Sequence, residues 1–168
     1  MLFPTGHTAR RAAHSEVEVV IETPRNSRNK YEVDEQGVVR FDRRLPGAFA
    51  FPADYGFIPG AVGTDGEPLD ALVPMVEPTY PGVRVRARVV GVVWVRTGHG
   101  REAKLVCVPL GDPAYRAVQD LGQLPDHLVR EITHFFDIYR DLDPGKDVSF
   151  AGSDGVDVAV ETLQRARG

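Results

Sequence analysis

The sequence predicts one α+β domain, mainly β: a small closed or nearly closed barrel with helices packed against it. Through most of the first 110 residues, apolar positions alternate with polar ones or form short β-branched runs. Farther along, the apolar spacing becomes helical, and no internal repeat or Gly/Ser-rich linker divides the chain. We expect a flexible N-terminal arm at 1–15 and a single domain at 16–168.

The first strands are short and separated by turns. The alternating segment EVEVVIE at 16–22 predicts a strand, and KYEVDEQGVVRFDR at 30–43 predicts a hairpin around an Asp-Glu-Gln-Gly turn. The aromatic segment at 51–60 is bracketed by Pro and Gly, which favours an ordered loop with a short strand. A short apolar strand is expected at 71–76.

A long hairpin follows in the middle of the chain. The β-branched segment at 82–96 predicts a long strand, in which Gly91 marks a bulge or bend. The turn TGHG at 97–100 leads into an apolar strand at 103–110. These segments complete the set of strands that the barrel requires.

Two helices end the chain. The segment at 124–142 has apolar residues at helical spacing, Pro125 and Asp126 suit its first turn, and DPG at 143–145 stops it. A second, weaker helix is expected at 156–167.

Composition narrows the function classes. Of the 168 residues, 42% are hydrophobic and 26% are charged, which favours a globular protein over a disordered one. The net charge of −4 does not support nonspecific nucleic-acid binding. Cys107 is the only cysteine and lies in an apolar run, so a buried thiol and a reducing compartment are expected. The absence of a secretory signal and of a long apolar span predicts a cytoplasmic protein without membrane partners.

Three acids crowd the segment TDGEPLDALVP: Asp65, Glu67 and Asp70. Oxygen ligands on a turn stiffened by Gly66 and Pro68 suit hard cations such as Mg²⁺ or Mn²⁺. The alternative interpretation is a solvated charged turn between strands.

A second acidic position lies in GREAKLV, where Glu102 and Lys104 are two residues apart and therefore point to the same face of a strand. A carboxylate beside an ammonium suits a metal–phosphate site. The alternative is an exposed ion pair that contributes about 0.2–1 kcal/mol.

Cations that suit a phosphate recur at the ends of predicted elements: Lys30, Arg43, Lys104 and Arg140, the last beside Tyr139. Arginine makes bidentate contacts to phosphate, and tyrosine adds a neutral donor. Each cation alone is more typical of a solvated surface, so only the combination points to a site.

Other chemistries find less support. His134 lies beside the apolar face of the predicted long helix, which favours a packed or subunit-interface histidine. No histidine or cysteine spacing typical of zinc occurs, and no P-loop, dinucleotide or nucleophile-elbow motif is present. An OB-like nucleic-acid-binding domain is disfavoured by the mild acidity and by the lack of aromatics interleaved with basic strands.

Five segments occur together in one order: VIETPRNSRNKYEVDEQG, FPADYGFIPG, DGEPLDALV, REAKLVCVP and HFFDIYRDL. In these segments the chain resembles the soluble family I inorganic pyrophosphatases over about residues 16–145. The resemblance implies a five-stranded OB-like barrel with flanking helices. It also implies Mg²⁺-dependent hydrolysis of pyrophosphate to two phosphates, and a homohexamer.

The resemblance also implies roles for individual residues. By position, Asp65, Asp70 and Glu102 are implied metal ligands, and Glu67, Tyr55 and Asp70 are implied catalytic groups. The implied phosphate-binding residues are Lys30, Arg43, Lys104, Tyr139 and Arg140, the last replacing a Lys. Glu22 and Glu32 match acids at the edge of the site.

Three of the four central acids depart from the family pattern. Glu67 and Glu102 stand where the family has Asp, and Thr97 lies near the place of a further metal-binding Asp. We therefore expect either a pyrophosphatase with reduced activity or altered metal preference, or an impaired paralogue that binds pyrophosphate or a nucleotide without efficient turnover.

Overall fold

A computed structural model describes residues 15–145 and 147–168, so the arm predicted at 1–15 lies outside the described residues except for its last position. The strands of the described part are β1 (Glu16–Thr23), β2 (Asn29–Val33), β3 (Val39–Arg44), β4 (Asp54–Val62), β5 (Pro68–Val73), β6 (Arg84–Thr97), β7 (Gly100–Pro109) and β8 (Ser149–Asp154). Its α-helices are α2 (Asp126–Ile138) and α3 (Val156–Arg167), with short 3₁₀ turns at Pro113–Tyr115 and Leu121–Gln123.

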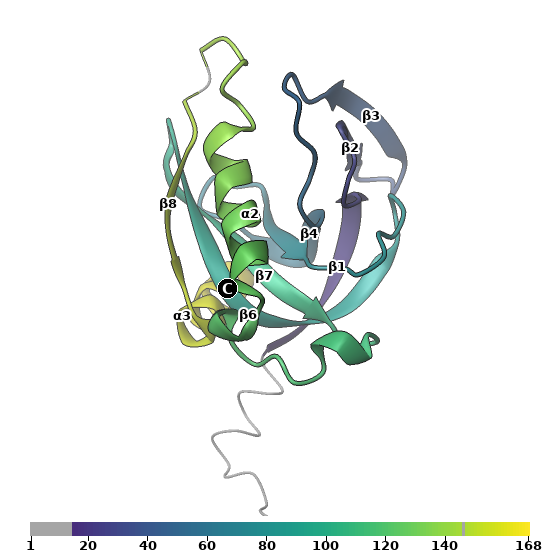
Figure 1. The fold of residues 1–168 in the computed structure, drawn as a ribbon, viewed down its shortest axis with the longest axis vertical. Helices are drawn as coiled ribbons and strands as arrows, with labels where there is room; N and C mark the ends of the chain where they lie inside the picture. The colour runs from purple at the N-terminus through teal and green to yellow at the C-terminus, as the bar shows by residue number, and fades with distance from the viewer. Residues whose placement is uncertain (1–14, 146) are drawn as a thin grey trace, which may run out of the picture.

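Five strands close into a ring, in the order β1-β4-β5-β7-β6, because β1 pairs with both β4 and β6. β8 adds to the outer side of β6, and β2 and β3 form a separate hairpin. Figure 1 shows this hairpin at the same end of the molecule as the segment that follows α2. The prediction of a five-stranded OB-like barrel with flanking helices is confirmed.

The strands bury apolar side chains on both faces. Ala71 and Val73 belong to one buried cluster that includes Leu163 of α3, while Leu72 between them belongs to a second cluster with Phe135 and Phe136 of α2. This alternation is the period of a β-strand covered on both sides. Each fully buried side chain of this size contributes about 1.5–3 kcal/mol to the free energy of folding. The two helices therefore stabilise the sheet through two separate apolar clusters, one on each face.

Several element boundaries differ from the prediction. The segment at 51–60, expected as an ordered loop with a short strand, holds most of the nine-residue strand β4. Gly56 lets β1 approach closely, because a Cβ there would lie 1.8 Å from the Val20 carbonyl oxygen. Pro59 is tolerated in β4 because it falls at a register shift between Ile58 and Val62.

Other boundaries moved by a few residues. The apolar strand expected at 71–76 is β5 at Pro68–Val73, and the helix expected at 124–142 is α2 at Asp126–Ile138. β8, which was not predicted, has the sequence SFAGSD with little apolar alternation, so only its pairing with β6 makes it a strand. The predicted bulge at Gly91 is confirmed by a register shift between β6 and β7. No helix in the described part of the chain is long and apolar enough to cross a membrane.

Candidate active site

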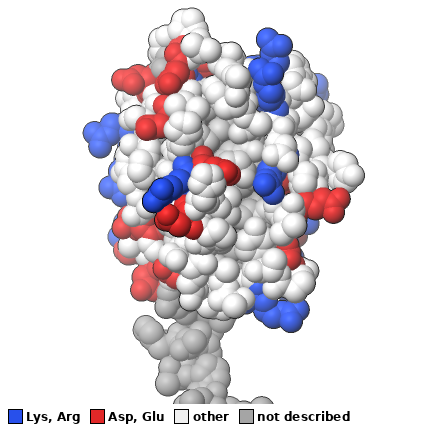
Figure 2. Space-filling view, in the orientation of Figure 1, with Lys and Arg blue, Asp and Glu red and all other residues white. Residues whose placement is uncertain are grey.

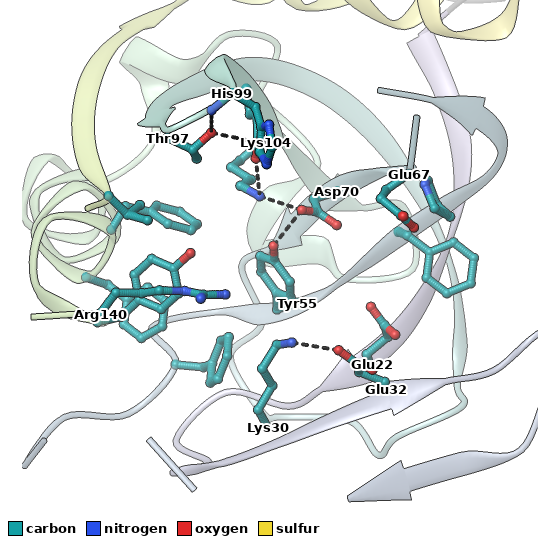
Figure 3. Close-up of a pocket in the computed structure, with 18 of the residues that line it drawn as sticks. Glu22, Lys30, Glu32, Tyr55, Glu67, Asp70, Thr97, His99, Lys104 and Arg140 are labelled. Carbon is teal, nitrogen blue, oxygen red and sulfur yellow. Dashed lines mark hydrogen bonds and ion pairs between the residues drawn. The ribbon is translucent and has the colours of Figure 1, made fainter. Parts of the chain in front are cut away.

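A cavity of about 900 Å³ opens between the β2–β3 hairpin, strands β4, β5 and β7, and α2 with the segment after it. The predicted site residues that line it are Glu22, Lys30, Glu32, Tyr55, Glu67, Asp70, Glu102, Lys104, Tyr139 and Arg140. Asp65 and Arg43 are not among its lining residues. In Figure 3, Lys30, Glu32 and Glu22 lie below Tyr55, Arg140 reaches in from the left, and Glu67 lies to the right.

Asp70 is the centre of the polar contacts in this cavity. It lies opposite Lys104 in the parallel pairing of β5 and β7, and Lys104 Nζ donates to its Oδ2 at 2.5 Å. Tyr55, from β4, donates its hydroxyl to the same oxygen at 2.8 Å. Asp70, Lys104 and Tyr55 lie on the sheet face that also carries the apolar cluster of Leu72, Phe135 and Phe136. The cavity therefore adjoins that cluster.

The protonation states of these partners follow from burial and charge. Burial alone lowers the pKa of Lys104, but the charge and hydrogen bond of Asp70 outweigh it, so the pKa is raised and the side chain stays a cation. Burial, together with the Asp70 charge, raises the pKa of Tyr55 well above its usual value, so its hydroxyl remains a neutral donor. Asp70 is thus held by one cationic and one neutral donor.

Glu22 reaches the cavity through an irregularity in β1. The β1–β4 register pairs Ile21 with Gly56 and Thr23 with Tyr55, which leaves Glu22 without a partner across the pair. A bulge of this kind re-aims a side chain. Burial raises the pKa of Glu22 from 4.5 to about 7, with Asp70 adding to the rise and a hydrogen bond from the Val33 N–H at 2.9 Å opposing it.

Glu22 should therefore make stability fall as pH rises. Its folded pKa exceeds its unfolded pKa, so the folded state binds the extra proton between pH 4.5 and 7, and stability declines across that window. With divalent ions removed, Glu22→Gln should be as stable as the wild type near pH 4 and more stable by up to about 3 kcal/mol at pH 8. Urea denaturation at several pH values measures this difference.

Glu18→Gln is the matched control, because Glu18 lies on the same strand and is about half exposed. It removes an exposed carboxylate that pairs with Arg84 outside the cavity, and it should not raise stability at pH 8 as Glu22→Gln does. If Glu22→Gln retains the wild-type slope between pH 4.5 and 7, the prediction is wrong.

The β2–β3 hairpin brings two predicted phosphate ligands together. Lys30 and Arg43 are opposite each other in register, and the register then shifts so that Asp42 is the extra residue of β3. Lys30 Nζ contacts Glu32 Oε1 at 2.8 Å and Asp42 Oδ2 at 3.1 Å. Arg43 instead contacts Asp143, and it is not among the residues that line the cavity.

Tyr139 and Arg140 follow directly on the last turn of α2. Tyr139 caps the helix, with its backbone N–H donating to the Phe135 carbonyl, and its ring stacks on Phe135. Arg140 lies over the Tyr139 ring, 5.4 Å from its centroid, and its Nε is buried without a hydrogen-bond partner. A guanidinium of this kind offers donors to an anion in the cavity.

Thr97 has a specific partner. Its hydroxyl contacts Glu102 Oε1 at 3.0 Å and accepts a hydrogen bond from the His99 N–H at 3.2 Å. Glu102 also lies 3.9 Å from Lys104, which confirms that these two side chains share a strand face. Threonine therefore fixes the Glu102 carboxylate at a place where a second acid would repel it.

The three predicted metal ligands line a second cavity of about 340 Å³, which shares Asp70, Glu102 and Lys104 with the first. Their carboxylate oxygens suit Mg²⁺ or Mn²⁺. Among residues 15–145 and 147–168, no group of three or more His, Cys, Asp or Glu side chains is arranged to hold an ion by itself. Mg²⁺ is commonly bound by one or two carboxylates plus substrate phosphates, and the donor set fits an ion of that kind.

Sequence reasoning missed several polar residues that line the cavity, including Asp34 and Glu35 from the β2–β3 turn and His99 from the β6–β7 turn. Both turns directly adjoin strands that carry predicted site residues. Their position next to these strands is the signal in the sequence that could have identified them as residues of the cavity. Acidic and basic side chains intermingle over the face shown in Figure 2 and do not form a field of one sign.

Comparison with known proteins identifies relatives over most of the chain. The family model described as inorganic pyrophosphatase matches residues 19–168. The chain is 45% identical over 150 residues to an inorganic pyrophosphatase of Methanosarcina acetivorans, which covers 89% of each chain. It is 45% identical over 152 residues to one of Streptomyces coelicolor, covering 90% of this chain and 93% of that one. The solved inorganic pyrophosphatase of Helicobacter pylori superposes with a TM-score of 0.88 at 39% identity, covering 92% of both chains.

Proposed function

The chain belongs to the inorganic pyrophosphatase family, whose members hydrolyse a phosphoric anhydride with a divalent metal, and we propose that the cavity around Asp70 is where this chain does so. The observation that carries the proposal is the place of Asp70. Its carboxylate is held by Tyr55 and Lys104 within a cavity that is lined by both acidic and basic side chains.

The cations are proposed to bind the two phosphoryl groups. Lys30 enters from the β2–β3 hairpin, Lys104 from β7 and Arg140 from the end of α2, so charges approach the anion from three sides. Pyrophosphate is compact and highly charged, and holding it from several directions fixes one phosphorus for attack. Tyr139 and the neutral Tyr55 hydroxyl add donors without adding charge.

The acids are proposed to serve the attacking water. Its oxygen forms a bond to one phosphorus while the bridging P–O bond breaks, and Glu67 accepts the proton that the water loses. Asp70, oriented by Tyr55 and Lys104, holds the water in line with the leaving phosphate. Asp65, Asp70 and Glu102 are the residues that would hold a divalent ion together with the substrate phosphates, and that ion would neutralise the phosphate oxygens and make the water more acidic.

The finer features remain proposals. We expect Mg²⁺ as the ion, with Mn²⁺ as an alternative, and an activity or metal preference altered by Glu67, Thr97 and Glu102. A homohexamer with a contact near His134 and a cytoplasmic location also stay predictions from the sequence.

Release of phosphate from pyrophosphate, measured first with Mg²⁺ and then with Mn²⁺, tests the proposal. Turnover with either ion supports it. Tight binding of pyrophosphate without release under any divalent ion would instead favour the impaired paralogue. If the chain neither binds pyrophosphate nor releases phosphate from it, the proposed pyrophosphatase and the impaired paralogue are both rejected.

A further inference from the structure

A carboxylate outside the predicted site contacts a cation within it. Asp143 Oδ2 accepts a hydrogen bond from Arg43 Nη1 at 2.5 Å, and the two side chains are only 18% and 27% exposed. Arg43 lies in β3 and Asp143 in the turn after α2, 100 positions along the chain. The ion pair therefore joins the two segments that lie at the same end of the molecule in Figure 1.

Two guanidinium groups, one of them part of this contact, have unused donors. Arg43 Nη2 and Arg140 Nε are the buried side-chain polar atoms without a hydrogen-bond partner in the described part of the chain. Asp143 is linked to both arginines, because its backbone N–H also donates to the Arg140 carbonyl at 2.9 Å. Buried donors of this kind are costly unless a ligand satisfies them, and a phosphate with several acceptor oxygens can do so.

Asp143 differs from the carboxylates that contact the other cations. The carboxylates that contact Lys30 and Lys104 lie on β-strands: Glu32 on the same strand as Lys30, and Asp42 and Asp70 on a paired strand. Asp143 instead lies in a turn between α2 and β8, so its carboxylate can leave Arg43 without breaking a strand pairing. Gly145, two residues later, has φ of 72° and lines the cavity, which places this turn at the cavity itself.

We propose that Asp143 is an internal competitor for the phosphate site of Arg43, an inference that rests on the proposed function. Without substrate, the Asp143 carboxylate is paired with the Arg43 guanidinium. A phosphoryl group of pyrophosphate carries more negative charge and more acceptor oxygens, so it displaces the carboxylate and engages Arg43 together with Arg140. When phosphate leaves, Asp143 pairs with Arg43 again. The contact thus weakens the binding of substrate and product alike at Arg43 and promotes product release.

Asp143→Asn tests this inference, with binding of the non-hydrolysable imidodiphosphate and of inorganic phosphate measured by calorimetry. Removing the competing charge raises the fraction of chains with a free Arg43, so both anions should bind about fivefold more tightly. The KM for pyrophosphate should fall by a similar factor without a rise in kcat. Asp141→Asn is the control, because Asp141 lies exposed in the same turn and should change neither constant.

The gain must depend on Arg43. In an Arg43→Ala background, Asp143→Asn should leave both affinities unchanged. If Asp143→Asn binds the two anions equally or more weakly than the wild type, Asp143 does not compete and the inference is wrong, while the proposed function stands. If the wild-type chain binds neither anion with any divalent ion present, both the inference and the proposed function fail.

Discussion

Replacing Asp70 by asparagine should lower kcat/KM for pyrophosphate by about 1,000-fold, because the site loses the one charge on which Tyr55 and Lys104 converge. Asparagine keeps the shape of the side chain but cannot match the carboxylate as a ligand for a hard cation. Steady-state phosphate release with saturating Mg²⁺ measures the loss. A variant that keeps more than a tenth of wild-type activity would contradict the assignment of Asp70 to the reaction.

The same substitution should also reduce the free energy of unfolding. Measuring stability and activity in the same variants separates the structural effect of Asp70 from its catalytic effect. The Lys104 side chain is 8% exposed, so Asp70→Asn leaves a nearly buried cation with a weaker partner. We expect a loss of about 1–3 kcal/mol in the free energy of unfolding. Lys104→Met should offset part of that loss in the double variant but restore no activity. Additive stability losses in the two single variants and the double variant would show that the pair is not coupled.

The sequence predicted best the features that depend on neighbours along the chain. Glu102 and Lys104 share a strand face because they are two residues apart, and the structure shows them 3.9 Å apart. The long strands and the helix at 156–167 follow from apolar periodicity alone.

Features that depend on contacts between residues far apart in the sequence could not be predicted from it. The resemblance named Glu22, but nothing along the chain indicates the irregular pairing with β4 that brings its side chain into the cavity, and β8 is a strand only because β6 pairs with it. The pair of Arg43 and Asp143 joins residues 100 positions apart, and neither residue carries a local signal for the other. The resemblance therefore named residues that line the cavity, but neither it nor the residue pattern indicated the partner that each side chain takes.

The triple variant Glu67→Asp, Thr97→Asp, Glu102→Asp should raise Mg²⁺-supported kcat/KM by about 100-fold. Each glutamate places its carboxylate about 1–1.5 Å farther from the backbone than aspartate would, and a misplacement of about 1 Å can cost 100-fold in rate. Mg²⁺ tolerates such misplacement poorly because it requires near-octahedral geometry. The gain should therefore be smaller with Mn²⁺. Glu77→Asp, which shortens an exposed glutamate outside both cavities, should change nothing.

Thr97 makes the three substitutions interdependent. Its hydroxyl lies 3.0 Å from Glu102 Oε1, so Thr97→Asp alone replaces this hydrogen bond with two carboxylates in repulsion. Without divalent ions, the single variant should be less stable than the wild type by about 1 kcal/mol, and Mg²⁺ should bind more tightly and restore that stability. Thermal unfolding with and without Mg²⁺, beside calorimetry with Mg²⁺ alone, measures both effects without relying on turnover. A Thr97→Asp variant that neither loses stability nor binds Mg²⁺ more tightly would show that position 97 does not face the ion, and the altered acids would no longer account for altered metal use.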